Sequence, residues 1–376
     1  MRILLAPDSF KGSLSAAQVA GHLAAGIHRV DPAAEVVQIP IADGGEGTVA
    51  AALAAGYAPV EVKVTGALGA PVAATYARRG SHAVVEMASA AGLDQVPPDA
   101  GSARTAGTEG VGELIRHALD HGATEVLLGL GGSATTDGGA GLARALGVGL
   151  RDGSGALLAR GGAALADLAR VDLSGLDPRV SRLRVVLAAD VTSPLLGEQG
   201  AAAVFGPQKG ADAATVADLE SGLTRWVEVL VETGAPRARE IAGAGGAGAA
   251  GGLGYGAMVL LGATRRSGIE AVLEMVGFAE QLRGADLVIT GEGSMDSQSL
   301  AGKAPVGVAA AARAAGVPVV AVVGRCTVEE GTARAHGIDA VHALLDLEPD
   351  VQRCLAHAGE LVERAVGLAL APTVGG

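Results

Sequence analysis

Residues 291–303 gather glycine, hydroxyl, carboxylate and ammonium groups into one short stretch, Gly-Glu-Gly-Ser-Met-Asp-Ser-Gln-Ser-Leu-Ala-Gly-Lys. The stretch follows an apolar run at residues 285–290 and precedes an Ala/Val-rich segment at residues 305–315. This sequence of features is typical of a buried strand, a turn and a helix. Loop N–H groups and the positive end of the helix dipole then face one crevice, which suits an anion such as phosphate. The candidate substrate- or phosphate-binding residues of this loop are Gly291, Glu292, Gly293 and Ser294.

A glycine loop of this kind can also do no more than turn a strand into a helix, and its spacing is not that of a Walker A motif. Lysine usage favours chemistry. The 28 basic residues include only four lysines, namely Lys11, Lys63, Lys209 and Lys303, and all but Lys63 stand in stretches that contain glycine or serine. An ammonium and a guanidinium are not interchangeable at a phosphate or a carboxylate. We therefore interpret Lys11 and Lys303 as catalytic candidates.

Composition excludes several classes of function. The net charge of −12 and an aromatic content of 2% argue against nucleic-acid binding, which needs a basic face and stacking side chains. No purely apolar run reaches the roughly 18 residues of a membrane span, and the N-terminal residues do not resemble a signal peptide. Two cysteines are too few for a disulfide framework. We expect a soluble cytoplasmic protein without nucleic-acid or membrane partners.

The apolar runs at both ends of the chain predict a parallel sheet. Residues 2–6 and 35–40 each read as a strand that is followed by a polar glycine-containing turn and a helical segment. The pattern returns near the C-terminus, so we predict one parallel α/β domain from residues 1–58 and 284–376. Residues 59–283 begin with alternating strands and are predicted to form an inserted mixed α/β domain.

Polar side chains follow the first two predicted strands. Asp8 and Ser9 come directly after the first strand, and Asp43 comes shortly after the second. The carboxyl ends of strands in an open α/β sheet are where ligands bind. Asp8 and Ser9 are therefore candidate substrate-binding residues.

Five blocks of sequence together resemble the bacterial type I glycerate kinases. They are residues 8–11 (Asp-Ser-Phe-Lys), 42–48 (Ala-Asp-Gly-Gly-Glu-Gly-Thr), 131–139 (Gly-Gly-Ser-Ala-Thr-Thr-Asp-Gly-Gly), 205–210 (Phe-Gly-Pro-Gln-Lys-Gly) and 290–303. The resemblance runs from residue 2 to the C-terminal helix. It implies a flavodoxin-like domain made by both chain ends and an inserted restriction-enzyme-like domain. It also implies ATP- and Mg²⁺-dependent phosphorylation of D-glycerate, usually at the 2-hydroxyl to give 2-phosphoglycerate.

Phosphoryl transfer requires positioning and charge neutralisation, and the motifs offer groups for both. Asp43 and Glu46, which flank two glycines after a strand, are the candidate Mg²⁺ ligands, with waters completing the shell. Gly44 and Gly45 between them are candidates for binding the substrate or its phosphate. An aspartate that only caps a glycine turn is the alternative. Lys11 and Lys303 would bind the transferring phosphate or the glycerate carboxylate.

The general base is less defined by the sequence. Asp190 ends an apolar run and is a candidate for accepting the proton of the substrate hydroxyl, with Asp296 and Asp8 as rivals. An aspartate at that place can equally cap the following turn. Ser133 and Thr135 can offer hydroxyl and N–H groups to the nucleotide phosphates, and tight helix–sheet packing is the alternative for their glycine-rich loop.

Other functions remain open at this point. They are a kinase of another small hydroxy acid, a kinase that forms 3-phosphoglycerate, and a nicotinamide-dependent hydroxy-acid dehydrogenase. The dehydrogenase is disfavoured because no Gly-x-Gly-x-x-Gly opens the first turn. A galactokinase-like kinase is disfavoured because only residues 129–134 are similar to its phosphate loop, and a nucleotide-binding regulator would need fewer charged loops. The oligomeric state is undecided, and a homo-oligomer is compatible with the sequence.

Overall fold

The computed structural model describes residues 1–235 and 237–374. By their contacts these residues form two compact units. Unit 1 contains Met1–Asp43, Ala50–Gly56 and the described residues from Ser267 onward, and unit 2 contains Gly44–Val49 and the described residues of Tyr57–Arg266.

Unit 1 is built on a five-stranded parallel sheet. Its strands, in their order across the sheet, are β15 (Ala340–Ala343), β13 (Val319–Val323), β11 (Leu287–Gly291), β1 (Arg2–Pro7) and β2 (Glu35–Gln38). All five residues of β11 are buried, which is typical of a parallel strand in a sheet that is covered on both faces. The prediction of a parallel-sheet domain formed by both chain ends is confirmed.

The strand order creates a switch point between β1 and β11. In chain order, the five strands of this sheet lie as 2-1-3-4-5, which is the flavodoxin-like arrangement. Ligands of such sheets bind outside the carboxyl ends of the strands at the switch point. Asp8 directly follows β1 and Glu292 directly follows β11, so these two carboxyl groups stand at that place.

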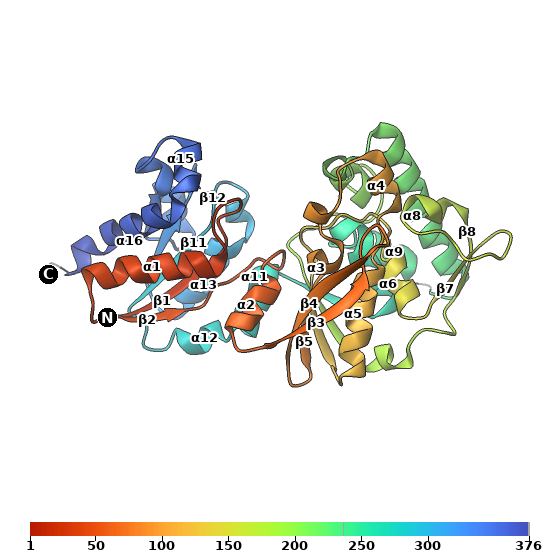
Figure 1. Ribbon diagram of the computed structural model, residues 1–376, viewed down its shortest axis with the longest axis horizontal. Helices are drawn as coiled ribbons and strands as arrows, with labels where there is room; N and C mark the ends of the chain where they lie inside the picture. The colour runs from red at the N-terminus through yellow and green to blue at the C-terminus, as the bar shows by residue number, and fades with distance from the viewer. Residues whose placement is uncertain (236, 375–376) are drawn as a thin grey trace. The chain divides into compact units, whose positions relative to one another are not determined.

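Helices cover the sheet of unit 1. Helices α1 (Ala16–Val30) and α16 (Ala358–Val374) pack against each other (Figure 1). They share a core with alternate strand residues such as Ile3 and Ile289. Helix α13 (Ala304–Ala314) packs against β11 and β13.

Local sequence explains how α1 begins and how closely it packs. The Ser15 hydroxyl accepts a hydrogen bond from the Gln18 backbone N–H at 3.3 Å, and the Gln18 side-chain oxygen accepts one from the Ser15 N–H at 2.9 Å. This capping box satisfies two backbone N–H groups at the start of the helix. A Cβ at Gly26 would lie 2.4 Å from Val366 of α16, so glycine is what permits this helix contact.

The remaining elements with residues in unit 1 are short. They are α2 (Thr48–Ala54), α11 (Gly268–Met275), α12 (Phe278–Gln281), β12 (Ser294–Met295), η6 (Ser299–Ala301), β14 (Arg325–Cys326), α14 (Glu330–Ala335), η7 (Leu344–Asp346) and α15 (Val351–Ala356).

Unit 2 contains a six-stranded mixed sheet. Its strands, in order, are β10 (Thr264–Arg266), β9 (Arg184–Ala188), β6 (Glu125–Gly129), β5 (His82–Glu86), β4 (Pro71–Arg79) and β3 (Ala58–Thr65). Strands β3, β4 and β5 are antiparallel neighbours, as the alternating pattern predicted, whereas β5, β6, β9 and β10 run parallel. Glu86, Gly129 and Ala188 pair in register, so these strands end at one common edge.

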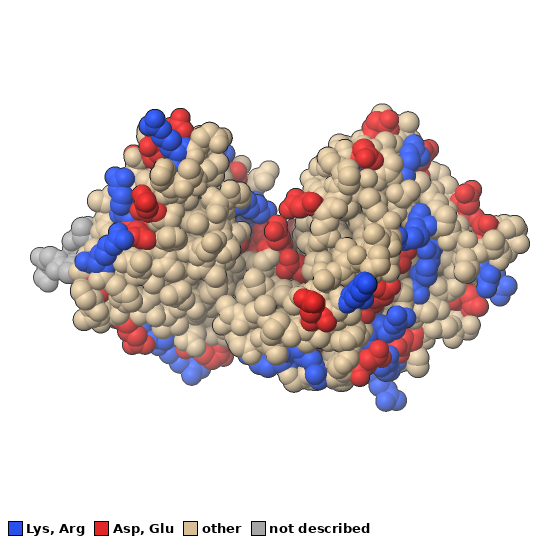
Figure 2. Space-filling view, viewed as in Figure 1, with Lys and Arg blue, Asp and Glu red and all other residues tan. Residues whose placement is uncertain are grey.

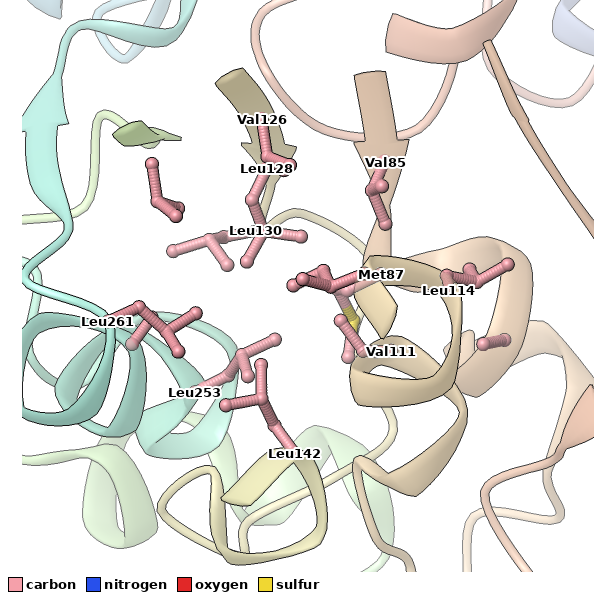
Figure 3. Packing of buried hydrophobic residues seen from close by; sticks show 14 of the residues in the cluster. Val85, Met87, Val111, Leu114, Val126, Leu128, Leu130, Leu142, Leu253 and Leu261 are labelled. Carbon is pink, nitrogen blue, oxygen red and sulfur yellow. The ribbon is translucent and has the colours of Figure 1, made fainter. Parts of the chain in front are cut away.

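Packed side chains hold that edge in place. Figure 3 shows Val85 and Met87, the neighbours of Glu86, in one cluster with Leu128 and Leu130, the neighbours of Gly129. All four are almost fully buried. Because protein interiors are close-packed, the backbone at the ends of β5 and β6 has little freedom to move.

The other elements of unit 2 surround this sheet. They are α3 (Met87–Ala91), η1 (Leu93–Gln95), α4 (Ala100–Thr105), α5 (Glu109–Asp120), α6 (Ala140–Ala145), β7 (Gly149–Asp152), η2 (Ala163–Asp167), β8 (Leu168–Asp172), η3 (Pro178–Arg182), α7 (Ala201–Phe205), η4 (Pro207–Lys209), α8 (Ala213–Glu232), α9 (Ala238–Ala242), η5 (Ala249–Gly252) and α10 (Leu253–Leu260).

The glycine-rich stretch at residues 243–256 is a tightly packed entry into α10. Ala250 and Gly251 both have positive φ values, of 52° and 64°. A Cβ at Gly251 would lie 1.8 Å from the carbonyl oxygen of Thr135. Glycine is therefore required where this stretch meets the loop after β6.

The limits of the two units differ from the boundaries that periodicity suggests. Contacts place Gly44–Val49 in unit 2 and residues 267–283 in unit 1, whereas the sequence pattern places the boundaries after residues 58 and 283. Unit 1 thus includes α11 and α12, and α11 packs against α13.

Charged side chains of both signs are interspersed over the face in Figure 2. Among the described residues, no helix is long and apolar enough to cross a lipid bilayer.

Candidate active site

The carboxyl edge of the unit 1 sheet brings β1 and β11 side by side. The Asp8 backbone N–H donates a 2.8 Å hydrogen bond to the Gly291 carbonyl, and the Ser9 N–H donates to the Asp8 carboxylate at 2.6 Å. Asp8 and Gly291 are more than 280 residues apart in the chain, yet neighbouring parallel strands deliver both to one place. Asp8, Ser9 and Gly291 are therefore brought together.

Neighbouring charged side chains shift the pKa of Asp8 in this group. Burial in the first place, and the neighbouring Asp43 in the second, raise the pKa of the Asp8 carboxyl from 3.8 to about 7, against the lowering effect of the Ser9 N–H and the Lys11 ammonium. Glu292 also raises this pKa. Two carboxyl groups and one ammonium therefore act on the Asp8 carboxyl at the end of β1.

Glu292 links the cluster to the loop after β11. Burial raises the pKa of its carboxyl group, whereas the Ser299 hydroxyl and the Lys303 ammonium lower it. Asp296 and Asp43 act in the opposite direction. One carboxylate oxygen of Glu292, Oε1, is buried and has no hydrogen-bond partner in the described part of the chain.

Two glycines of this loop have a packing reason to be glycine. A Cβ at Gly291 would lie 2.0 Å from the Val322 carbonyl oxygen, and one at Gly293 would lie 3.3 Å from the Lys11 backbone nitrogen. Gly291 must therefore be glycine for β11 to lie beside β13. Gly293 brings the loop close to the backbone of Lys11.

The rest of the loop is partly engaged in local structure. The Ser294 hydroxyl accepts a 3.2 Å hydrogen bond from the Arg325 guanidinium. The Asp296 carboxylate accepts one from the Gln298 N–H at 2.8 Å, so it stabilises a turn. Lys303 is half-buried at the start of α13.

A second group of candidate residues lies at the carboxyl edge of the unit 2 sheet. The Leu130 N–H donates a 3.1 Å hydrogen bond to the Gly44 carbonyl. A Cβ at Gly131 would lie 2.5 Å from the Gly45 Cα. Glycine at residue 131 therefore allows the two backbones to touch, and the segment at residues 44–45 has a packing role that the sequence alone did not separate from ligand binding.

Glu86, at the end of β5, is a residue that sequence reasoning missed. Its carboxylate accepts hydrogen bonds from the backbone N–H groups of Gly47 at 3.2 Å and Val49 at 3.0 Å. It is 7% exposed, and burial raises its pKa while these two N–H groups lower it. An acidic residue that closes an otherwise apolar run was the available signal. Glu46, which is exposed, acts electrostatically on Glu86.

The loop after β6 is organised by a second buried carboxylate, Asp137. It accepts hydrogen bonds from the Thr108 N–H and hydroxyl, both at 2.9 Å, and from the N–H groups of Gly139 and Gly141 at 3.1 and 3.0 Å. Burial raises the pKa of this carboxyl group. Because all of its partners are local to unit 2, Asp137 is a structural centre of the loop.

Lys209 is buried beneath the same loop. Its ammonium donates a 2.5 Å hydrogen bond to the Thr135 carbonyl, and the side chain is 2% exposed. Burial lowers the pKa of Lys209 to about 7, while Asp137 raises it. The scarcity of lysine suggested a chemical role for Lys209. Its hydrogen bond to the Thr135 carbonyl shows that it also contacts the backbone of the loop.

Ser133 and Thr135 are both buried. The hydroxyls of Thr135 and Thr136 have no hydrogen-bond partner among the described residues. Asp190 follows the end of β9, whose Ala188 pairs with Gly129, so it stands at the same edge of the sheet.

The candidate residues thus fall into two groups, one in each unit. Unit 1 holds Asp8, Ser9, Lys11, Asp43, Gly291, Glu292, Gly293, Ser294, Asp296 and Lys303, and unit 2 holds Gly44, Gly45, Glu46, Ser133, Thr135 and Asp190. Asp43 acts electrostatically on Asp8 and Glu292, and Glu46 acts on Glu86. The described residues contain no group of three or more His, Cys, Asp or Glu side chains that could hold a metal ion.

Comparisons with known proteins agree with these motifs. The sequence model of the glycerate kinase family matches residues 3–371. A glycerate kinase of Bacillus subtilis (strain 168) is 44% identical over 367 residues, which is 97% of this chain and 95% of that protein. A glycerate 2-kinase of Escherichia coli (strain K12) is 44% identical over 348 residues, which is 92% of this chain and 91% of that protein.

A solved structure gives the same result for the fold. A crystal structure described as a glycerate kinase 2 from Salmonella typhimurium LT2 matches with a TM-score of 0.83 and 42% identity, over 99% of each chain. The resemblance carried by the five sequence blocks is confirmed, and the chain belongs to the glycerate kinase family of kinases.

Proposed function

We propose that this protein transfers the γ-phosphoryl group of ATP to the 2-hydroxyl of D-glycerate and forms 2-phosphoglycerate. The observation that carries the proposal is the cluster of Asp8, Lys11, Asp43, Glu292 and Lys303 at the switch point of a flavodoxin-like sheet. The names of the Bacillus subtilis and Escherichia coli relatives support the substrate, and the second of them supports the 2-hydroxyl.

The two lysines supply positive charge where it is needed. Phosphoryl transfer depends on positioning and on neutralising charge on the phosphoryl oxygens. Lys11 acts on Asp8, and Lys303 acts on Glu292, so both ammonium groups belong to the cluster at the strand ends. We assign them to the transferring phosphoryl group and to the carboxylate of glycerate.

The carboxylates of unit 1 fit a divalent cation. Asp43 raises the pKa values of the carboxyl groups of Asp8 and Glu292, and Glu292 has a buried carboxylate oxygen without a partner among the described residues. Oxygen ligands of this kind suit Mg²⁺, which takes one or two carboxylates and keeps several waters. We propose Asp43, with Glu46 as the second sequence candidate, as the Mg²⁺ ligands. When bound, the ion would neutralise charge on the ATP phosphates.

Three aspartates compete for the role of general base. Asp190 stands at a strand end in unit 2, and we retain it as the first candidate. Asp8 has a pKa of about 7, which suits a base that works near neutral pH. The Asp296 carboxylate already stabilises a turn, which disfavours it. For the nucleotide phosphates we propose Ser133 and Thr135, whose loop follows β6.

Direct analysis of the product tests the proposal. The protein is incubated with ATP, Mg²⁺ and D-glycerate, and ³¹P NMR separates 2-phosphoglycerate from 3-phosphoglycerate. L-glycerate, glycolate and D-lactate serve as alternative acceptors in parallel reactions. Formation of 2-phosphoglycerate from D-glycerate alone supports the proposal. A product phosphorylated at the 3-hydroxyl, or a preference for another hydroxy acid, would replace it with the corresponding alternative.

A further inference from the structure

Residues 44–49 carry three proposed site residues, Gly44, Gly45 and Glu46, and belong to unit 2 although both flanking segments belong to unit 1. The chain therefore enters unit 2 after Asp43 and leaves it again at Ala50. Specific contacts must hold so short a segment in unit 2.

The Glu86 side chain binds the backbone of this segment at Gly47 and Val49. Its two carboxylate oxygens accept hydrogen bonds from Gly47 and Val49, one oxygen for each N–H group. Backbone contacts hold the other end, where Leu130 donates to Gly44 and Gly131 packs against Gly45. Residues 44–49 are thus fixed on both sides of Glu46.

A carboxylate suits this position better than any neutral side chain. Gly47 and Val49 each present an N–H donor, and an ionised carboxylate can accept at both oxygens. A glutamine has the same shape but offers one acceptor and one NH₂ group, which would face a second donor. Glu86 is anchored in turn by the packed neighbours Val85 and Met87 (Figure 3).

We propose that Glu86 is a positioning residue of the kinase site, which sets the place of Gly44, Gly45 and Glu46 by binding the backbone of Gly47 and Val49. The inference rests on the proposed function for its consequence in catalysis. Glu86 itself acts through the loop and does not touch the reacting groups.

A matched pair of variants tests this role. Glu86→Gln removes one acceptor at the loop. Glu113→Gln removes the same kind of acceptor elsewhere in unit 2, where the Glu113 carboxylate accepts hydrogen bonds from the Thr65 N–H at 2.7 Å and the Thr65 hydroxyl at 2.8 Å. Glu86→Asp keeps the charge and both acceptors on a shorter side chain, and serves as the conservative variant if Glu86→Gln does not fold.

Two readouts are compared in the full-length protein. Amide hydrogen exchange without Mg²⁺ or substrate should become about tenfold faster at Gly47 and Val49 in Glu86→Gln, but not in Glu113→Gln. The kcat per folded molecule should fall about tenfold or more in Glu86→Gln, because small displacements of a site are costly, and should be partly restored in Glu86→Asp. Glu113→Gln should stay within about twofold of the wild type.

Each outcome has a definite meaning. Faster exchange with unchanged kcat would reduce Glu86 to a structural residue and overturn the inference, as would unchanged exchange at Gly47 and Val49. An equal loss of kcat in both glutamine variants would also overturn it. A wild-type protein that forms no phosphoglycerate would contradict the proposed function instead, and the exchange data would still decide whether Glu86 holds the loop.

Discussion

The Lys209 ammonium donates a 2.5 Å hydrogen bond to the carbonyl oxygen of Thr135 in the interior of unit 2. A lysine held in this way must lose much of its hydration, and Asp137 is the charge that compensates it in part. The loop that carries Ser133 and Thr135 is thus fixed by a buried cation and a buried anion.

Alkaline pH should stabilise the protein through Lys209. Its folded-state pKa of about 7 lies below the unfolded value of 10.5, so the unfolded state binds more protons between these values and stability rises with pH across that window. The rise should be on the order of a few kcal/mol. Urea unfolding of the wild type and of Lys209→Met between pH 6 and 10 measures it. The wild-type curve should rise relative to that of the variant, and parallel curves would refute the assignment.

Asp8 should act in the opposite direction at lower pH. Its folded-state pKa of about 7 lies above the unfolded value of 3.8, so its stabilising contribution is complete below pH 3.8 and is lost as the pH rises through 7. Asp8→Asn should therefore be more stable than the wild type at pH 8 by on the order of a few kcal/mol, with little difference near pH 4. Unfolding is measured without divalent cations. Equal stability differences at both pH values would argue against a raised pKa of the Asp8 carboxyl in the folded protein.

The strands that position Asp8 could be predicted from the sequence. The contacts of Lys209 and Glu86 in unit 2 could not. Parallel strands are continuous apolar runs that end in glycine or polar residues, so β1 and β11 and the residues after them are visible in the sequence. Lys209 and Thr135 are 74 residues apart, and Glu86 and Val49 are 37 apart. No periodicity encodes such contacts, because each depends on how distant elements pack.

Sequence reasoning also could not divide residues 42–48 between the two units. The motif Asp-Gly-Gly-Glu looks like one metal loop, yet Asp43 acts on Asp8 while Glu46 acts on Glu86. The division follows from backbone contacts of Gly44 and Gly45 with residues 129–131, and glycine serves both close packing and ligand binding.

Substitution of the two cluster lysines should remove activity without unfolding the protein. Lys11→Ala and Lys303→Ala should each lower kcat/KM about a hundredfold to a thousandfold, because each removes positive charge from the phosphoryl group. Arginine should rescue little, since its planar fork places charge differently. Lys63→Ala, at an exposed residue of β3, is the control. Steady-state kinetics with D-glycerate decide the matter, and activity close to wild type in Lys11→Ala and Lys303→Ala would remove these lysines from the site.

The close contact between Gly131 and Gly45 predicts how a substitution there affects stability. Gly131→Ala would place a methyl group 2.5 Å from the Gly45 Cα, so the backbones must separate. We expect a loss of about 1 to 3 kcal/mol in stability, together with lower kcat. Gly153→Ala, where a Cβ meets nothing within 4 Å, should change neither. Thermal unfolding and kinetics of the two variants, measured side by side, test whether residues 44–45 and 129–131 must touch.

The general base can be identified by comparing three isosteric variants. If Asp190 accepts the proton of the substrate hydroxyl, Asp190→Asn should lower kcat about a hundredfold to ten-thousandfold and leave ATP binding almost unchanged. The acidic limb of the pH profile should also disappear in that variant, because the limb reports protonation of the base. Asp296→Asn should cost less, since its carboxylate serves a turn that an asparagine can also stabilise. A limb with a midpoint near pH 7 that is lost only in Asp8→Asn would transfer the role to Asp8, whose carboxyl pKa lies at about 7.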